Sequence, residues 1–167
     1  MSPRACNVLF LCTGNSARSV MAEALLNRLG QGRFQAFSAG SFPAGRVNPF
    51  TLELLRSKGF PVDSLRSKSW DEFAGPDAPA MDFIFTVCDN AAGEACPLWP
   101  GHPATAHWGF EDPAAFIGPD AEKRREFERV FTSIAARVQR FVALPLDRLD
   151  RTSLLLELRR IGDEKPA

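Results

Sequence analysis

The chain has 167 residues, of which 45% are hydrophobic and 24% charged, a composition typical of one globular domain rather than of a disordered or fibrous chain. Its 20 basic and 20 acidic residues cancel, which excludes a global positive field that would recruit nucleic acid or an anionic membrane. No apolar run approaches the roughly 18 to 20 residues that span a bilayer, and the opening MSPRACNVLFLC lacks a complete signal peptide, so we expect a cytoplasmic protein.

The first half of the chain alternates between strand-like and helix-like patterns. An apolar run at 7–11 predicts a strand, and 16–30 has apolar residues at helical spacing and ends at a glycine, which predicts a helix. Residues 34–40 alternate as a second strand. Asn48, followed by proline, predicts the start of a helix that ends at Gly59.

The second half continues this alternation. An apolar run at 81–87, followed directly by Cys88, predicts a strand, and a short strand is expected around 105–108. A long amphipathic helix is predicted from Asp120, and a final helix over 147–161. Strands that alternate with helices predict an α/β fold, a doubly wound (flavodoxin-like) four-stranded parallel sheet with helices on both faces.

The loop after the first strand, CTGNSARS, carries the clearest chemical signal. In a parallel sheet, ligands bind at the carboxyl ends of the strands, and small residues around Gly14 let backbone N–H groups point inward beside the positive end of the next helix. Arg18 would clamp two oxygens, and the same field is expected to lower the pKa of Cys12 from ~8.5 to between ~3.5 and 7.5, as a thiolate nucleophile requires. The alternative is a buried strand-end cysteine followed by a solvated arginine. The predicted oxyanion-binding residues are Thr13, Gly14, Asn15, Ser16, Ala17, Arg18 and Ser19.

A family resemblance follows from this loop. VLFLCTGNSARSVMAEALL closely resembles the opening of the low-molecular-weight protein tyrosine phosphatases and of the thiol-coupled arsenate reductases that share their fold. The resemblance continues through FSAG, VNPFTLELLRSKG, TVCDNAAGEACPLWPG and HWGFEDPA, and the last two blocks are similar to the arsenate reductase branch. It implies a phosphatase-like arsenate reductase domain over 1–144, with 145–167 as a C-terminal helical extension of the same domain.

Either chemistry needs an acid that protonates the departing oxygen. Asp112 in EDPA follows the strand-like AHWGF, and the resemblance implies that it is this acid. An aspartate before a proline is also a common turn residue, and Glu111 is the rival acid. The phosphatases typically place tyrosines beside the acid, whereas this chain has no tyrosine, which argues against a phosphotyrosine substrate. His107 and Trp108 are expected to pack rather than to react.

Reducing arsenate to arsenite moves two electrons, which a pair of thiols supplies by forming a disulfide. The resemblance implies that Cys12 attacks arsenate, that Cys88 then attacks Cys12 as arsenite leaves, and that Cys96 attacks Cys88. The final disulfide would then join Cys88 and Cys96. The alternatives are a zinc site formed with Cys12 and a histidine, and inert core cysteines. Cys6 has no counterpart in the family pattern and is expected to be structural or incidental.

The resemblance also assigns supporting positions. Asn15 and Ser19 match residues that hold the loop and tune the cysteine. In some arsenate reductases the positions of Asn15, Glu23 and Ser38, with a downstream aspartate, form a potassium site. Here Lys68 stands near the aspartate position, so its ammonium is expected to replace the ion, and no metal site is predicted.

The expected substrate is arsenate, with no bound cofactor. The expected redox partner is an external thiol reductant, either thioredoxin or glutathione with glutaredoxin, and neither nucleic acid nor membrane is an expected partner. Two other functions remain open at this point. One is a phosphatase acting on small phosphate esters or phosphoproteins. The other is an oxyanion-binding or redox-sensing regulator that forms the Cys88–Cys96 disulfide without turnover.

Overall fold

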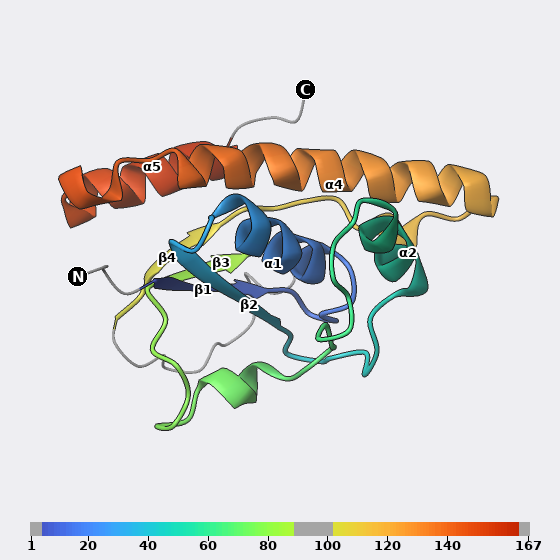
Figure 1. Cartoon of the computed structure of the whole chain (residues 1–167), viewed down its shortest axis with the longest axis horizontal. Coiled ribbons are helices and arrows are strands. Elements are labelled where there is room, and N and C mark those ends of the chain that lie inside the picture. Colours follow the sequence, from blue (N-terminus) through green and yellow to red (C-terminus); the bar gives the residue numbers. More distant parts are fainter. Residues whose placement is uncertain (1–4, 89–101, 164–167) are drawn as a thin grey trace.

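The computed structural model describes residues 5–88 and 102–163. Four parallel strands form one sheet in the order β2-β1-β3-β4 (Figure 1). The strands are β1 (Cys6–Leu11), β2 (Phe34–Ala39), β3 (Phe83–Thr86) and β4 (Ala104–His107). Each lies where the sequence predicted a strand, and the parallel order confirms the predicted fold class.

In residues 5–88 and 102–163 there are four α-helices and three short 3-10 helices, of which α1, α2 and η1 lie between strands and the others follow β4. Asn48 begins α2 as predicted, because its side chain accepts the Phe50 N–H at 2.9 Å and Pro49 occupies the first helical position. The α-helices are α1 (Arg18–Leu29), α2 (Pro49–Ser57), α4 (Asp120–Val142) and α5 (Arg151–Asp163). The 3-10 helices are η1 (Trp70–Phe73), η2 (Pro113–Ala115) and η3 (Leu146–Arg148).

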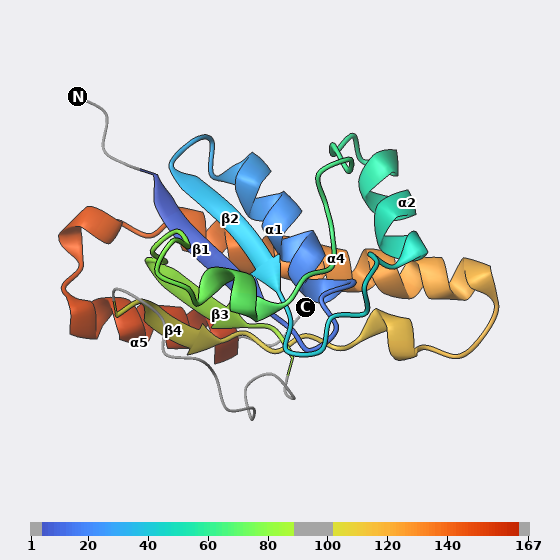
Figure 2. The same ribbon diagram turned by 90° about the horizontal axis from the view of Figure 1, so that it is seen from below.

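Alternate residues of the strands serve two different cores, because successive side chains of a strand point to opposite faces. On one face Phe10 and Phe85 pack beneath α1, α4 and α5, which lie on the same side of the sheet in Figure 1. On the other face Leu9 and Ile84 pack with Phe73 of η1, the green helical turn below the sheet. The sheet is therefore covered on both faces, by a helical layer on one and by η1 on the other (Figures 1 and 2).

The last helix is part of the larger core. The indole N–H of Trp108, which follows β4, donates to the carbonyl of Leu158 in α5 at 3.0 Å, and both side chains are fully buried. The indole also stacks on Phe85 with ring centroids 3.9 Å apart. Gly162 allows this close approach, since a Cβ there would lie 2.4 Å from the carbonyl oxygen of His107. The packing of α5 thus fixes the chain at the exit of β4.

Replacing Trp108 by phenylalanine should lower the free energy of unfolding by about 1 to 3 kcal/mol. The smaller ring leaves a void and removes the only side-chain donor that this residue offers to the buried Leu158 carbonyl. Urea denaturation at an unchanged m-value measures the loss. Leu156→Ala is the control on the same helix, because Leu156 is 54% exposed and its truncation should change stability little. An unchanged midpoint for Trp108→Phe would contradict the anchoring role of this hydrogen bond.

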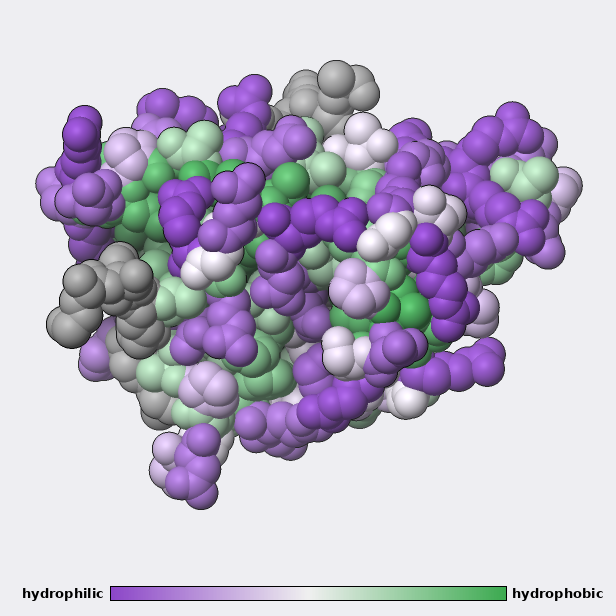
Figure 3. All heavy atoms as spheres, in the orientation of Figure 1, coloured by the Kyte–Doolittle hydropathy of each residue, from purple (hydrophilic) through white to green (hydrophobic). Residues whose placement is uncertain are grey.

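The surface seen in Figure 3 is mostly hydrophilic, with hydrophobic side chains in small areas between polar ones. The large apolar side chains most exposed among the described residues are Phe42, Ile117 and Leu156. Within residues 5–88 and 102–163, no helix has both the length and the apolar character needed to cross a membrane.

Candidate active site

Cys12 and Cys88 are brought side by side by the parallel pairing of β1 and β3. Leu11, the last residue of β1, pairs with Thr86, the last residue of β3, so both strands deliver their next residues to the same edge of the sheet. The main-chain N–H of Thr13 donates to the Cys88 sulfur at 3.3 Å. Both thiols are buried, with Cys12 5% and Cys88 3% exposed. In the described part of the chain, neither takes part in a disulfide.

The loop that follows Cys12 is held from outside through its carbonyl groups. The five outer hydrogen bonds run from Phe42 N–H to Thr13 O (3.0 Å), Ala44 N–H to Gly14 O (2.9 Å), Ser67 Oγ to Gly14 O (3.1 Å), Asn48 N–H to Ser16 O (3.0 Å) and Thr51 Oγ1 to Ser16 O (3.1 Å). Because the C=O and N–H of a trans peptide point in opposite directions, the next N–H groups face away from these partners. Residues 12–18 line a cavity of about 170 Å³ together with Asp112 and Ala114.

Gly40 supports this loop in a way that the sequence interpretation missed. A Cβ at position 40 would lie 2.4 Å from the Thr13 carbonyl oxygen and 2.6 Å from that of Cys12. Only glycine therefore allows the chain after β2 to pass so close to the loop. The FSAG block that contributed to the resemblance contains this glycine, but nothing local in the sequence identifies its neighbour.

Asn15 and Ser19 form the inner support of the loop. Asn15 is fully buried and has a φ of 45°, a left-handed conformation that asparagine tolerates better than most residues. Its Nδ2 donates to Ser19 Oγ at 2.8 Å, and its Oδ1 accepts the Lys68 N–H at 2.9 Å. Asn15 therefore ties the loop to the start of α1 through Ser19 and to the segment at Lys68, and both side chains are buried in the core.

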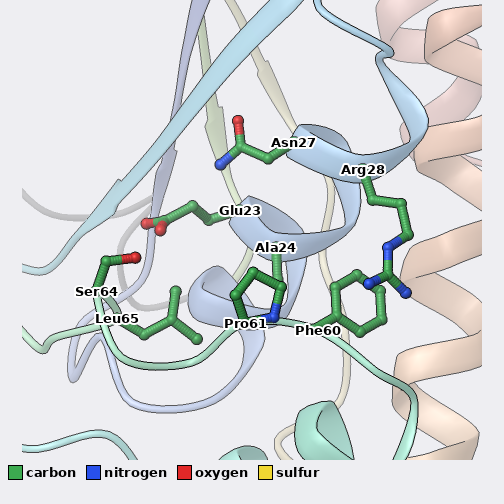
Figure 4. Close-up of a pocket in the computed structure, with 8 residues that line it drawn as sticks. All are labelled: Glu23, Ala24, Asn27, Arg28, Phe60, Pro61, Ser64 and Leu65. Atoms are coloured by element: carbon green, nitrogen blue, oxygen red, sulfur yellow. The ribbon is translucent and has the colours of Figure 1, made fainter.

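Glu23, Ser38 and Lys68 form a charged cluster behind the loop. Ser38 Oγ donates to Glu23 Oε1 at 2.7 Å, and Lys68 Nζ lies 3.7 Å from the same oxygen. Burial raises the pKa of Glu23, which Lys68 and Ser38 oppose, and burial lowers the pKa of Lys68. Figure 4 shows Glu23 on the wall of a pocket of about 240 Å³ between α1 and the segment around Phe60 and Leu65. The Lys68 ammonium thus places a positive charge beside the Glu23 carboxylate.

Replacing Lys68 by methionine should destabilise the fold by about 3 kcal/mol at pH 8, because it leaves the Glu23 carboxylate buried without its cation. The pKa of Glu23 would rise further. A carboxyl whose pKa is raised on folding destabilises the protein as the pH rises through that pKa, because the buried group must then become charged. The difference in unfolding free energy between the variant and the wild type should therefore shrink from pH 8 toward pH 5. Denaturation at several pH values measures this trend.

Lys58→Met is the matched control, because Lys58 pairs with Glu128 at the surface and its loss should change stability by less than about 1 kcal/mol. A deficit in Lys68→Met that is the same at both pH values would contradict the pairing with Glu23.

Arg18 connects the loop to the predicted acid. Its Nη2 lies 3.6 Å from Asp112 Oδ2, and its Nη1 donates to the carbonyl of Phe110 at 3.1 Å. Asp112 also caps η2, since its Oδ1 accepts the Ala114 N–H at 3.0 Å. Asp112 can therefore serve as a turn residue through one carboxylate oxygen and still lie beside Arg18 at the cavity. Glu111 instead pairs with Arg129 on the surface, and its side chain is 75% exposed, so the geometry favours Asp112 over Glu111.

The expected lowering of the Cys12 pKa is wrong for this structure. A side-chain hydrogen bond with Cys88 and burial raise the pKa of the Cys12 thiol, and together they outweigh Arg18 and the backbone N–H of Gly14, which lower it. The sequence could not reveal this, because Cys88 is 76 positions away. The two thiols therefore interact directly where β1 and β3 end.

The remaining predicted residues that the structure describes lie apart from the cavity. Cys96 falls outside the described residues. Cys6 begins β1, at the other end of the strand from Cys12. His107 Nδ1 lies 2.8 Å from the Thr86 hydroxyl, and Trp108 is buried in the core. In residues 5–88 and 102–163, no three His, Cys, Asp or Glu side chains are grouped so that they could hold a metal ion.

Comparison with known proteins identifies the family. Residues 7–153 match the model described as low molecular weight phosphotyrosine protein phosphatase, and the chain belongs to this family. The match covers the cysteine loop, both strand-end cysteines and Asp112, and it ends near the start of α5.

The relatives include proteins named for arsenate reduction and for phosphatase activity. The arsenate reductase of Bacillus licheniformis is 36% identical over 135 residues, which cover 80% of this chain and 93% of the relative. The crystal structure of arsenate reductase from Archaeoglobus fulgidus is 33% identical, with a TM-score of 0.64, over 82% of this chain and 99% of that chain. A low molecular weight protein tyrosine phosphatase from T. tengcongensis, 23% identical with a TM-score of 0.60 over 78% of this chain and 95% of that one, has the same fold. The resemblance noted from the sequence is thus confirmed.

Proposed function

We propose that this protein is an arsenate reductase that uses Cys12 as nucleophile and Cys88 as the second thiol. The observation that carries the proposal is the position of Cys88, whose sulfur accepts the N–H of Thr13, the residue after Cys12, at 3.3 Å, and whose thiol interacts with that of Cys12. A hydrolytic phosphatase needs one thiol, whereas reduction needs two that can form a disulfide. The relatives named arsenate reductase, at 36% and 33% identity, support this choice.

In the first step the Cys12 sulfur attacks arsenic. One As–O bond breaks, and Asp112 donates a proton so that the oxygen leaves as water. The product is a Cys12–S–As(V) adduct. Arg18 and the loop N–H groups hold the remaining oxygens and stabilise their negative charge. The Cys12 thiol must lose its proton before attack, since only the thiolate is nucleophilic.

In the second step the Cys88 sulfur attacks Cys12. An S–S bond forms, the S–As bond breaks, and its electron pair stays on arsenic, which leaves as arsenite. The two thiols are oxidised while As(V) becomes As(III), so the electrons balance. Cys96 then attacks Cys88, releases Cys12 and leaves a Cys88–Cys96 disulfide. An external thiol reductant supplies the two electrons that reduce this disulfide, with thioredoxin or glutathione and glutaredoxin as the proposed donors in a reducing cytoplasm.

Thiol counting tests the proposal directly. The reduced protein, mixed with excess arsenate in the absence of a donor, should lose two thiols per chain and release one arsenite. An unchanged thiol count with arsenate, together with hydrolysis of a small phosphate ester, would favour the phosphatase alternative, which the family as a whole supports. Thiol loss that is independent of arsenate would favour a redox sensor. Turnover with each purified donor system in turn identifies the donor.

Replacing Asp112 by asparagine should lower kcat for arsenate by about 10²- to 10⁴-fold, the range that general acids contribute. Asparagine preserves the N-cap of η2 and cannot donate the proton of a carboxylic acid. Steady-state turnover measures the loss, and Glu111→Gln is the matched control because Glu111 is paired on the surface. A larger loss for Glu111→Gln than for Asp112→Asn would reverse the assignment.

A further inference from the structure

A buried arginine of α4 holds the segment that leads to Asp112. Arg137 is 7% exposed, although arginine is rarely buried unless its charge is engaged. Its Nη1 donates to the carbonyl of Gly109 at 2.7 Å. Its guanidinium carbon lies 4.5 Å from the centre of the Phe110 ring, a cation–π geometry. One side chain therefore contacts two consecutive residues of the segment.

The same segment is fixed from two other directions. The Phe110 N–H donates at 3.2 Å to the carbonyl of Val87, which lies between the end of β3 and Cys88. The Phe110 carbonyl accepts Arg18 Nη1 at 3.1 Å. Asp112 lies two residues further on and 3.6 Å from the same arginine. The position of Asp112 therefore depends on how Gly109 and Phe110 are held.

A second contact from α4 to this segment, between Arg129 and Glu111, is of a different kind. Arg129 pairs with Glu111, but both side chains are largely exposed, at 46% and 75%. Exposed pairs hold geometry weakly because water screens them and long side chains reorient. The Arg137 hydrogen bond is charge-assisted and shielded, so it constrains the main chain more strongly.

We propose that Arg137 is a positioning residue that sets the location of Asp112 over the oxyanion cavity, acting through the Gly109 carbonyl and the Phe110 ring. This inference rests on the proposed function, in which Asp112 protonates the leaving oxygen. Arg137 does not line the cavity, so it is not expected to contact substrate.

A double-mutant cycle tests the inference. Arg137→Met should lower kcat for arsenate by about 10- to 100-fold with little change in KM, because small displacements of a reacting group cost this much. In the Asp112→Asn background the same substitution should cause no further loss. Arg137→Lys, which keeps a charged donor, should recover part of the activity. An equal fold loss in both backgrounds would overturn the inference.

Arg125→Met is the matched control, since Arg125 is an exposed arginine of the same helix and should leave kcat unchanged. Amide hydrogen exchange gives a readout that needs no turnover. The Phe110 amide should exchange faster in Arg137→Met than in Arg125→Met, and equal rates in the two variants would overturn the inference. A wild-type chain that does not reduce arsenate would refute the proposed function alone. The same double-mutant cycle would then be measured with p-nitrophenyl phosphate hydrolysis as the reaction.

Discussion

Replacing Cys88 by serine should reduce arsenate turnover by about 10⁴-fold or to below detection, the scale expected when a reacting group is removed. A hydroxyl cannot form the S–S bond that releases arsenite, so the reaction stops at the Cys12 adduct. Serine keeps an oxygen that can accept the Thr13 N–H, so the fold should be preserved. Arsenite formed per chain, in the presence of a donor system, measures the loss.

Cys6→Ser is the matched control, because Cys6 lies at the far end of β1 and should leave turnover unchanged. Full reductase activity in Cys88→Ser would refute the second step. A retained or increased rate of phosphate ester hydrolysis in the same variant is expected, because that reaction needs only Cys12.

The Cys88 contact has a further measurable effect on Cys12. Its hydrogen bond is the largest cause that raises the pKa of the Cys12 thiol. In Cys88→Ala this cause is removed while Arg18 and the Gly14 N–H still lower the pKa. The alkylation of Cys12 by iodoacetamide should therefore begin at lower pH than in the wild type. Alkylation profiles that coincide would contradict the coupling of the two thiols.

Replacing Cys12 by serine should remove arsenate reduction and phosphate ester hydrolysis together, again by about 10⁴-fold or more. The hydroxyl is similar in size and is far less acidic than a thiol, so the loop keeps its shape without a nucleophile. Steady-state assays of both reactions measure the loss.

Phosphate binding separates loss of the nucleophile from loss of the site. Cys12→Ser should still bind phosphate, because Arg18 and the loop N–H groups are unchanged, and titration calorimetry measures this. Loss of reductase activity with intact hydrolysis would show that Cys12 is not the shared nucleophile. Loss of phosphate binding would show that the substitution disturbs the loop itself.

Much of the fold could be predicted because its signals are local. Asn48 and Pro49 specify the start of α2, and the apolar runs specify the strands. The final helix begins at Arg151 rather than near Asp147, because Asp150 accepts the Ser153 N–H at 2.7 Å and so begins the helix there. Asp147 and Asp150 both have side chains that favour a helix start, so the sequence alone does not decide between them.

The site was predicted in part. The residues of the cysteine loop are consecutive, so their pattern is visible in the sequence, and Asp112 could be placed by resemblance. Gly40 and Arg137 act through the main chain of residues far away in sequence, and no local pattern marks such contacts. The raised pKa of Cys12 likewise depends on Cys88, a partner on another strand.

The outer hydrogen bonds of the cysteine loop have a consequence for the thermodynamics of binding. Fixing a backbone residue costs roughly 1 to 2 kcal/mol of conformational entropy, and a loop that ordered only around its anion would lose that entropy on each encounter. Here the loop is already ordered during folding, because its carbonyls accept hydrogen bonds from Phe42, Ala44, Asn48, Thr51 and Ser67. Oxyanion affinity should therefore reflect charge and dehydration, with little entropy lost by the protein on binding.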